Sequence, residues 1–294
     1  KDALPIKLTA ASDCPQYCGR VIKGINPAAA TPLWMQERLR RSGLRSLSPV
    51  VDVTNYILLE LGQPLHAFDL NKLEGGIEVR HARAGEQLLL LDGQTVDLQA
   101  GTLVIADSNK PLAMAGIMGG EESAVRDDTT AIFLESAWFN PLAIAGKARA
   151  YGLHTDSSHR FERGVSPALQ RRAIERATAL LLDIVGGQPG PVIQETVPKA
   201  LPITAPVMLR EARIEHVLGV WLPAKDISDI LTRLGMQLKP VKTGWEVTAP
   251  AFRFDISIEE DLIEEVARIY GYNRLTLEQP RTAMAIRPLP EARL

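Results

Sequence analysis

The sequence lacks most of the features that would assign a chain to a protein class at once. Its 294 residues include only two cysteines, Cys14 and Cys18, and its net charge is −2, because 35 acidic residues nearly balance 33 basic ones. Two cysteines are too few for a disulfide framework or a four-cysteine zinc site, so we expect reduced thiols. A charge this small gives no general attraction to nucleic acids or membranes.

Long apolar runs and the motifs of common enzymes are missing as well. No run approaches the roughly 18 residues of a membrane-spanning helix, and the opening KDALPIKLTA has neither an initiator methionine nor a signal-peptide core. We therefore expect a cytoplasmic protein excised from a longer chain. There is no G-x-S-x-G, H-E-x-x-H or Walker pattern, and the spacing of His154 and His159 is poor for joint metal ligation on a helix.

What is present is a mixture of helix and strand patterns. The segment 31–44 predicts an amphipathic helix that ends near Gly43, and 166–185 predicts a helix with Ser166 as N-cap and Pro167 at its first position. Residues 46–62 fit either a strand or a buried helix. Between 77 and 134, short β-like runs separated by Gly and Asp-Gly predict an antiparallel or mixed sheet.

The chain divides near its proline-rich segment. Five prolines in residues 188–206 predict a linker that contains one edge strand, and 207–272 shows three helix patterns and a hairpin, as in a winged-helix or related module. We expect an α+β chain: a large mixed-sheet domain with flanking helices, then a small helical, winged-helix-like domain of the DNA-binding type. The expected segments are 1–13 (end of a preceding module), 14–197 (large domain), 198–206 (linker), 207–275 (small domain) and 276–294 (tail toward a further domain).

A basic cluster lies between residues 145 and 176, where seven Lys and Arg face three Asp and Glu. Such an excess suits contact with a phosphate backbone. A solvated helix face, with pairs such as Arg171 and Glu175, explains it about as well. Within the cluster, HTDSSHRFERG predicts a polar loop that serves a ligand.

Two shorter stretches leave a structural and a functional interpretation open. His66 in GQPLHAFD is either a core histidine with satisfied ring nitrogens or a residue that points into a pocket. The glycines of MAGIMGGEES, Gly116, Gly119 and Gly120, predict a tight turn at a strand end. They gain a binding role only if other pocket residues converge on them.

An acidic run precedes the end of the chain. Asp261, Glu264 and Glu265 share one face of a predicted helix, and Asp255 lies just before it. Carboxylates favour a helix N-terminus in any case. However, Asp261 and Glu265 repel each other at this spacing, so a counter-ion, such as a hard cation like Mg²⁺, would stabilise them.

Several long stretches carry a family resemblance. The strings SPVVDVTNYILLELGQPLHAFD, AMAGIMGG, FLESAWFNP and TDSSHRFERGVSP resemble, in this order, the tRNA-editing domain of bacterial phenylalanine–tRNA synthetase (ligase) beta subunits. RFDISIEEDLIEEVARIYGYNRL is similar to the small accessory domain that follows in the same family. Together these stretches cover nearly the whole chain.

The resemblance implies a hydrolase embedded in a ligase. In this family the alpha subunit carries out ATP-dependent aminoacylation, and the editing domain hydrolyses the ester of tyrosine misattached to phenylalanine tRNA. An apolar site rejects an analogue that only adds a hydroxyl by about a hundredfold, whereas a second site that requires the hydroxyl discriminates better. The implied partners are phenylalanine tRNA and the alpha subunit, in a heterotetramer of two alpha and two beta chains, with no membrane. The alternative is a tRNA-binding and subunit-docking module whose editing pocket is inactive.

The resemblance also assigns roles to residues. The residues that match the family's editing pocket are Arg45, Pro64, His66, Gly119, Glu135 and Thr155. Glu135 is expected to bind the phenolic hydroxyl of tyrosine and is left unpaired by phenylalanine. His66 would hold the ester or the attacking water, and Thr155 would position that water. Arg45 would bind the polar end of the substrate or the terminal adenosine.

Three further implications concern the pocket backbone, a departure from the family and the metal. Gly119 would leave room for a backbone donor near the developing oxyanion, and Pro64 would fix the approach of the histidine. Ser157 stands where the usual TDASHRFERG form has alanine, which would make the substrate pocket narrower or more polar. The carboxylates implied to bind Mg²⁺, at a site shared with the alpha subunit, are Asp255, Asp261, Glu264 and Glu265.

Overall fold

The computed structural model of the protein describes residues 2–275. The chain forms two compact units, Lys1–Ile203 (unit 1) and Thr204–Leu294 (unit 2). The division falls inside segment 198–206, where the linker is expected. The expected tail, 276–294, lies outside the described residues.

A four-stranded antiparallel sheet in the order β11-β2-β10-β3 lies at the centre of unit 1. Its strands are β2 (Gln16–Lys23), β3 (His66–Asp69), β10 (Ala131–Trp138) and β11 (Gln188–Thr196). Every residue of β10 is buried, so other elements cover both faces of the sheet. β11 comes from the proline-rich segment and lies at an edge, which confirms the edge strand expected there.

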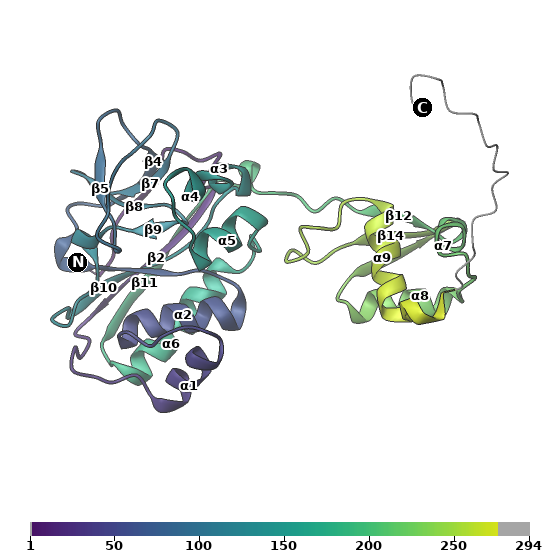
Figure 1. Cartoon of the computed structure of the whole chain (residues 1–294), viewed down its shortest axis with the longest axis horizontal. Helices are drawn as coiled ribbons and strands as arrows, with labels where there is room; N and C mark the ends of the chain where they lie inside the picture. The colour runs from purple at the N-terminus through teal and green to yellow at the C-terminus, as the bar shows by residue number, and fades with distance from the viewer. Residues whose placement is uncertain (1, 276–294) are drawn as a thin grey trace, which may run out of the picture. The chain divides into compact units, whose positions relative to one another are not determined.

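Three helices cover one face of this sheet (Figure 1). They are α1 (Leu33–Arg41), α2 (Pro49–Leu61) and α6 (Gln170–Ile184). The alternative left open for residues 46–62 is thus decided for the helix, with proline at its start and Gly62 at its end in the left-handed conformation, φ 76°. α6 begins later than expected, because residues 166–169 form a turn in which the Leu169 amide donates to the Ser166 carbonyl.

A second sheet packs against the other face (Figure 1). Its order is β1-β4-β7-β8-β9, with β1 (Ile6–Leu8), β4 (Ile77–His81), β7 (Leu103–Ala106), β8 (Pro111–Met114) and β9 (Met118–Gly119). A separate hairpin joins β5 (Gln87–Leu89) and β6 (Thr95–Asp97). These strands confirm the β-rich texture expected between 77 and 134.

The first strand differs from the expectation that residues 1–13 end a preceding module. β1 pairs in parallel with β4, and Ile6 is buried in the same core as its register partner Ile77. Burial of these apolar side chains ties the segment to unit 1.

Three short helices complete unit 1: α3 (Pro141–Ile144), α4 (Lys147–Ala150) and α5 (Asp156–Arg163). The prediction of a loop over HTDSSHRFERG is wrong, since most of it forms α5. Thr155 is the N-cap: its hydroxyl accepts from the Ser158 amide, and the Ser158 hydroxyl accepts from the Thr155 amide. This reciprocal capping box starts a helix in a segment whose polar composition looks like that of a loop.

Three buried glutamines connect β2, α6 and the turn before β3. The Gln16 side chain donates to the Gln170 side chain (2.8 Å), which donates to the Gln63 side chain (3.0 Å). Gln63 in turn donates to the backbone carbonyls of Pro64 (3.0 Å) and Ala137 (2.9 Å). The turn that leads into His66 is therefore held from two sides.

Unit 2 combines a three-stranded antiparallel sheet with three helices. The sheet has the order β12-β14-β13, with β12 (Val207–Arg210), β13 (Gln237–Val241) and β14 (Gly244–Thr248). The helices are α7 (Glu211–Leu218), α8 (Ala224–Arg233) and α9 (Glu259–Tyr270). This confirms the three helices and the hairpin expected from the sequence, and β12 adds a third strand to them.

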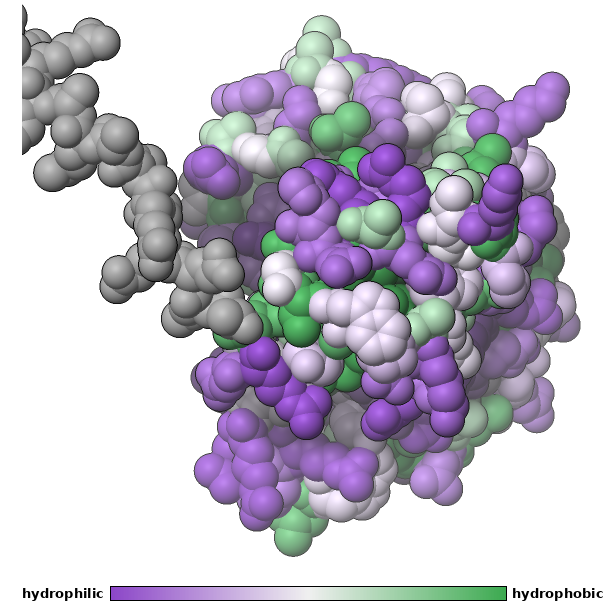
Figure 2. Space-filling model, turned by 90° about the vertical axis from the view of Figure 1, so that its right-hand side faces the viewer, coloured by the Kyte–Doolittle hydropathy of each residue, from purple (hydrophilic) through white to green (hydrophobic). Residues whose placement is uncertain are grey.

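The surface is mostly polar. The face that Figure 2 shows is mainly hydrophilic, with hydrophobic residues scattered over it in several small areas. Within residues 2–275, no helix combines the length and the apolar character needed to cross a membrane.

Candidate active site

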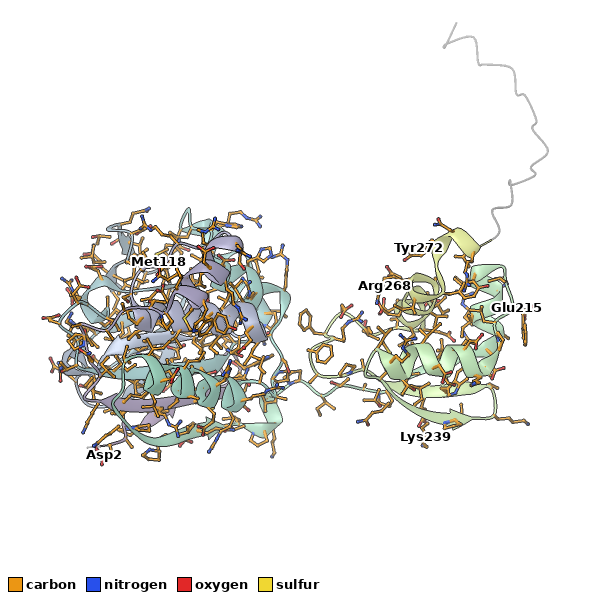
Figure 3. All side chains as sticks on the ribbon, turned by 90° about the horizontal axis from the view of Figure 1, so that it is seen from below. Asp2, Met118, Glu215, Lys239, Arg268 and Tyr272 are labelled. Atoms are coloured by element: carbon orange, nitrogen blue, oxygen red, sulfur yellow. The ribbon has the colours of Figure 1, made fainter. Side chains whose placement is uncertain are left out.

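A cavity of about 180 Å³ lies within unit 1. Its lining residues are Pro64, Leu65, His66, Leu91, Ile105, Ala113, Met114, Gly116, Ile117, Met118, Gly119, Glu135, Ser157 and Phe161. They come from β3, β7, β8, β9, β10, α5 and the loops beside them, and Figure 3 labels Met118 of β9. Five of the site residues expected from the sequence thus meet at one cavity, although almost a hundred residues separate the first from the last.

Strand register brings the two principal polar side chains together. His66 opens β3, and its partner in β10 is Glu135. Side chains directly opposite each other in an antiparallel pair lie on the same face of the sheet. That face points toward the second sheet, because Phe68 and Phe133, two residues farther along these strands, are buried in the core that the two sheets share.

Glu135 is a buried carboxyl, with 5% of its surface exposed. The hydroxyl of Tyr17 donates to its Oε2 atom at 3.1 Å. Burial raises the pKa of Glu135 to about 8, and the hydrogen bond from Tyr17 only partly offsets this effect. Glu135 is therefore mainly protonated at neutral pH.

His66 is the second polar group of the cavity, and its Nε2 atom is buried without a hydrogen-bond partner among the described residues. Its ring stands edge-on to Phe68, with 4.5 Å between the ring centroids. Burial lowers the pKa of His66 to about 4, so the ring is neutral at physiological pH. A buried nitrogen with no partner is costly, which favours a site that a ligand or water completes over a core histidine.

Gly119 allows the histidine to occupy this position. A Cβ atom at Gly119 would lie 2.5 Å from Cε1 and 2.8 Å from Nε2 of His66, closer than packed atoms approach. The backbone of β9 therefore borders the ring directly. Glycine at this position serves the cavity and not only a turn.

The remaining predicted residues lie around the cavity or away from it. The Ser157 hydroxyl donates to the Gly116 carbonyl at 3.0 Å, so the departure from alanine adds a contact to the wall. Thr155 does not line the cavity, but its hydroxyl donates to the carbonyl of Ile117, which does, at 2.9 Å. Arg45 is exposed in the loop between α1 and α2 and is not among the lining residues.

The sequence offered no sign of two further features. The apolar lining, which includes Ile105, Met114 and Phe161, has the composition of an ordinary core, so no pattern separates it from one. Tyr17 lies in CPQYC, where the neighbouring cysteines drew attention instead; Cys14 and Cys18 are both buried and free.

The acidic residues of unit 2 are held mainly by arginines. Arg253 pairs with Asp255 (2.7 Å) and with Glu265 (3.1 Å), which also binds Arg268. Hydrogen bonds from Arg253 lower the pKa of both carboxyls. Figure 3 labels Arg268 on α9. The counter-ions that the like charges require are thus supplied largely by the chain itself.

The other two carboxylates do not converge on this cluster. Asp261 accepts from the amides of Ser257 (2.8 Å) and Ile258 (2.9 Å), which caps α9, and Glu264 is exposed. In the part of the chain that the structure describes, no three or more His, Cys, Asp or Glu side chains are arranged to hold a metal ion. The arrangement does not fit Mg²⁺ as it stands, and Mg²⁺ binding by Asp255, Asp261, Glu264 and Glu265 stays a prediction.

Two family models match the chain. The B3/4 domain model matches residues 13–186, and the tRNA synthetase B5 domain model matches residues 207–272. The chain belongs to the B3/4 domain family. Its B3/4 domain contains the cavity, and its B5 match lies in unit 2.

The B3/4 and B5 matches agree with similarity to longer proteins. The chain is 58% identical over 294 residues to the phenylalanine–tRNA ligase beta subunit of Hahella chejuensis. The aligned region is 100% of this chain and 37% of the Hahella subunit. The chain is 60% identical over 288 residues to the corresponding subunit of Methylococcus capsulatus, covering 98% and 36%. The chain thus spans a little over a third of these relatives, and the family resemblance read from its motifs is confirmed.

A solved structure is also similar to this chain. It is an N-terminal fragment of the phenylalanyl-tRNA synthetase beta subunit from Pyrococcus horikoshii, with 16% identity, a TM-score of 0.41, and coverage of 92% of this chain and 79% of the fragment.

The shifted pKa values of Glu135 and His66 make the stability of the B3/4 domain depend on pH. Glu135 keeps its proton to about pH 8 in the folded domain but releases it near its ordinary value of 4.5 when unfolded. Between pH 5 and 8 unfolding therefore releases a proton and becomes more favourable as the pH rises. For His66 the sign is opposite: its contribution is present above pH 6.5 and is lost as the pH falls toward 4.

We expect the free energy of unfolding of the wild-type chain to fall, relative to a Glu135→Gln variant, between pH 5 and 8. Urea denaturation of both proteins at several pH values in this range measures the difference. Parallel pH profiles of the two proteins would contradict a protonated Glu135.

Proposed function

We propose that this chain is part of a phenylalanine–tRNA ligase and that its B3/4 domain hydrolyses the ester that links misattached tyrosine to phenylalanine tRNA. The supporting observation is that one cavity combines an apolar lining, a carboxyl and an unpaired imidazole nitrogen. The lining suits an aromatic ring, the carboxyl suits its hydroxyl, and the imidazole suits the polar, reacting end of the substrate. The names of the similar beta subunits support the first part of this proposal, membership of a phenylalanine–tRNA ligase.

Glu135 would supply the selectivity. Among the described residues that line the cavity it is the one carboxyl, and its Oε1 atom has no hydrogen-bond partner within residues 2–275. The phenol of tyrosine can accept a hydrogen bond from this oxygen in the protonated carboxyl or donate one to it in the carboxylate, whereas phenylalanine would leave a buried polar group unpaired. A site built to bind a hydroxyl rejects the analogue that lacks it by factors of about 10⁴ or more.

His66 would act by hydrogen bonding. Because its pKa is about 4, the ring is a weak base at physiological pH, so we assign it to orienting the attacking water or the ester carbonyl. In the reaction, the water oxygen bonds to the carbonyl carbon, the bond from that carbon to the ribose oxygen breaks, and the ribose oxygen receives a proton that the water loses. The neighbouring ribose hydroxyl of the tRNA is our candidate for assisting this transfer.

Gly119 and Thr155 would have supporting roles in this proposal. The position of Gly119 beside His66 would allow a backbone donor to approach the developing oxyanion. The Thr155 hydroxyl is already bonded to Ile117 and Ser158. Thr155 would therefore influence a water indirectly, by fixing the position of Ile117 in the cavity lining. In this proposal the alpha subunit uses ATP, and this chain binds phenylalanine tRNA. The ligase is a cytoplasmic heterotetramer of two alpha and two beta subunits.

The test is the deacylation of tyrosyl and phenylalanyl esters of phenylalanine tRNA by the intact ligase. We expect the tyrosyl ester to be hydrolysed at least a hundredfold faster than the phenylalanyl ester. An enzyme that spares the tyrosyl ester would leave the alternative, a tRNA-binding and subunit-docking module with an inactive pocket.

A specific feature of unit 2 favours docking as an additional role. Phe252, Phe254 and Ile258 are each more than half exposed in the segment between β14 and α9. Arg253 anchors this segment through Asp255 and Glu265. Clustered exposed aromatic residues on an ordered segment are typical of protein interfaces, and in this proposal the partner is the alpha subunit.

The helices of unit 2 support a winged-helix-like arrangement. α7 and α8 are joined by residues 219–223, in which Gly219 has the left-handed conformation (φ 67°), and a hairpin of β13 and β14 follows. This is the order of a helix-turn-helix with a wing. The exposed side of α8 carries charges of both signs, including Lys225 and Asp229, so it adds no clear attraction to nucleic acid.

A further inference from the structure

Tyr17 contacts the proposed selectivity group without lining the cavity. It is completely buried, and its hydroxyl donates to Glu135 Oε2 at 3.1 Å. It lies in β2 on the same sheet face as Glu135, because its register partner is Ala137, two residues farther along β10. Diagonal neighbours of this kind are within reach of long side chains.

The strand position opposite Glu135 gives the carboxyl little other support. That position in β2 is Gly19, where a Cβ atom would lie 2.2 Å from the ring of Phe133. No side chain there competes for the carboxyl. The Tyr17 hydroxyl is the one hydrogen-bond partner of the Glu135 carboxyl within the described residues.

We propose that Tyr17 is a positioning residue for specificity: its hydroxyl holds Oε2 of Glu135 and so leaves Oε1 as the oxygen that reads the substrate hydroxyl. This inference rests on the proposed editing function. A carboxyl held at one oxygen cannot rotate to exchange its two oxygens without breaking that hydrogen bond, so it presents the same acceptor in each catalytic cycle. The same donor also favours the ionised form of Glu135, which is the stronger acceptor for a phenol.

The test is Tyr17→Phe, which keeps the ring that packs in the core and removes the hydroxyl. In the intact ligase we expect about a tenfold loss in kcat/KM for the tyrosyl ester, with the slow hydrolysis of the phenylalanyl ester unchanged. A second measurement is independent of activity: ¹³C NMR of glutamate-labelled chain, with the Glu135 signal identified by its absence in Glu135→Gln. The Glu135 pKa should rise above its wild-type value of about 8 in Tyr17→Phe.

Tyr56→Phe is the matched control, because Tyr56 is buried in the other core of unit 1 and its hydroxyl bonds to Arg38 and Glu60. It should change neither the ester preference nor the pKa of Glu135. If Tyr17→Phe lowers only thermal stability and leaves ester preference and pKa as in the wild type, Tyr17 merely packs and the inference is overturned. If the wild-type ligase shows no preference for the tyrosyl ester, the proposed editing function is wrong. If the Glu135 pKa in Tyr17→Phe equals the wild-type value, Tyr17 does not position Glu135, whatever the outcome for editing.

Discussion

Replacing Glu135 by alanine should remove most of the preference of the ligase for the tyrosyl ester. The carboxyl faces the cavity, and without it the mostly apolar lining would offer the tyrosine phenol no carboxyl oxygen to replace its bonds to water. We expect kcat/KM for the tyrosyl ester to fall at least a hundredfold, and hydrolysis of the phenylalanyl ester to stay equal or rise slightly. Deacylation of the two esters, measured side by side at pH 7, gives the ratio.

Two controls separate recognition from folding in this experiment. Glu122→Ala removes a carboxyl that is exposed on the surface of the same unit and should leave the ratio at the wild-type value. Glu135→Gln keeps the size of the side chain and should retain part of the preference, since the wild-type carboxyl is itself largely neutral at pH 7. Equal preference in Glu135→Ala and the wild type would show that another group reads the hydroxyl.

Replacing His66 by alanine should reduce hydrolysis strongly while changing stability little. Loss of a donor or acceptor at the reacting centre typically lowers the rate by about 10² to 10³. The Nε2 atom has no partner among the described residues, so its removal breaks no hydrogen bond of the fold. What is lost is the edge-on contact with Phe68, worth about 1 kcal/mol.

Single-turnover deacylation and urea denaturation of the same preparations measure the two quantities for His66→Ala. The control is His81→Ala, which removes a partly exposed histidine that forms a hydrogen bond with Asp13 outside the cavity. A His66 variant that loses stability and activity together would restore the interpretation of a core histidine. So would a His66 variant with wild-type activity.

The sequence predicted the members of the site better than the way they are held. The convergence of His66, Gly119 and Glu135 could be expected only through the family resemblance, because strand pairing across tens of residues leaves no local pattern. β3 is only four residues long, and neither its pairing with β10 nor the register that places His66 opposite Glu135 follows from its own composition.

Local signals were stronger but were partly misread. The helix of 49–61 and its glycine stop follow from ordinary capping rules. The helix α5 was missed, because Thr155 and Ser158 form a capping box with serine in place of the usual glutamate or glutamine. In unit 2, the spacing of Asp261 and Glu265 indicated a need for positive charge, but not that Arg253 would supply it to Glu265 from within the chain.

The chain of buried glutamines has a consequence for how this domain can be recombined. Each of the three amides has another amide as a partner, so exchanging Gln16, Gln63 or Gln170 alone removes at least one amide–amide hydrogen bond from a buried network. The backbone carbonyls of Pro167 and Ser166 replace only part of what is lost. The three positions are therefore coupled, although Gln63 and Gln170 are 107 residues apart. A chimera that joins α6 of one relative to β2 and the His66 turn of another should keep the geometry of the histidine only when all three amides are transplanted as a set.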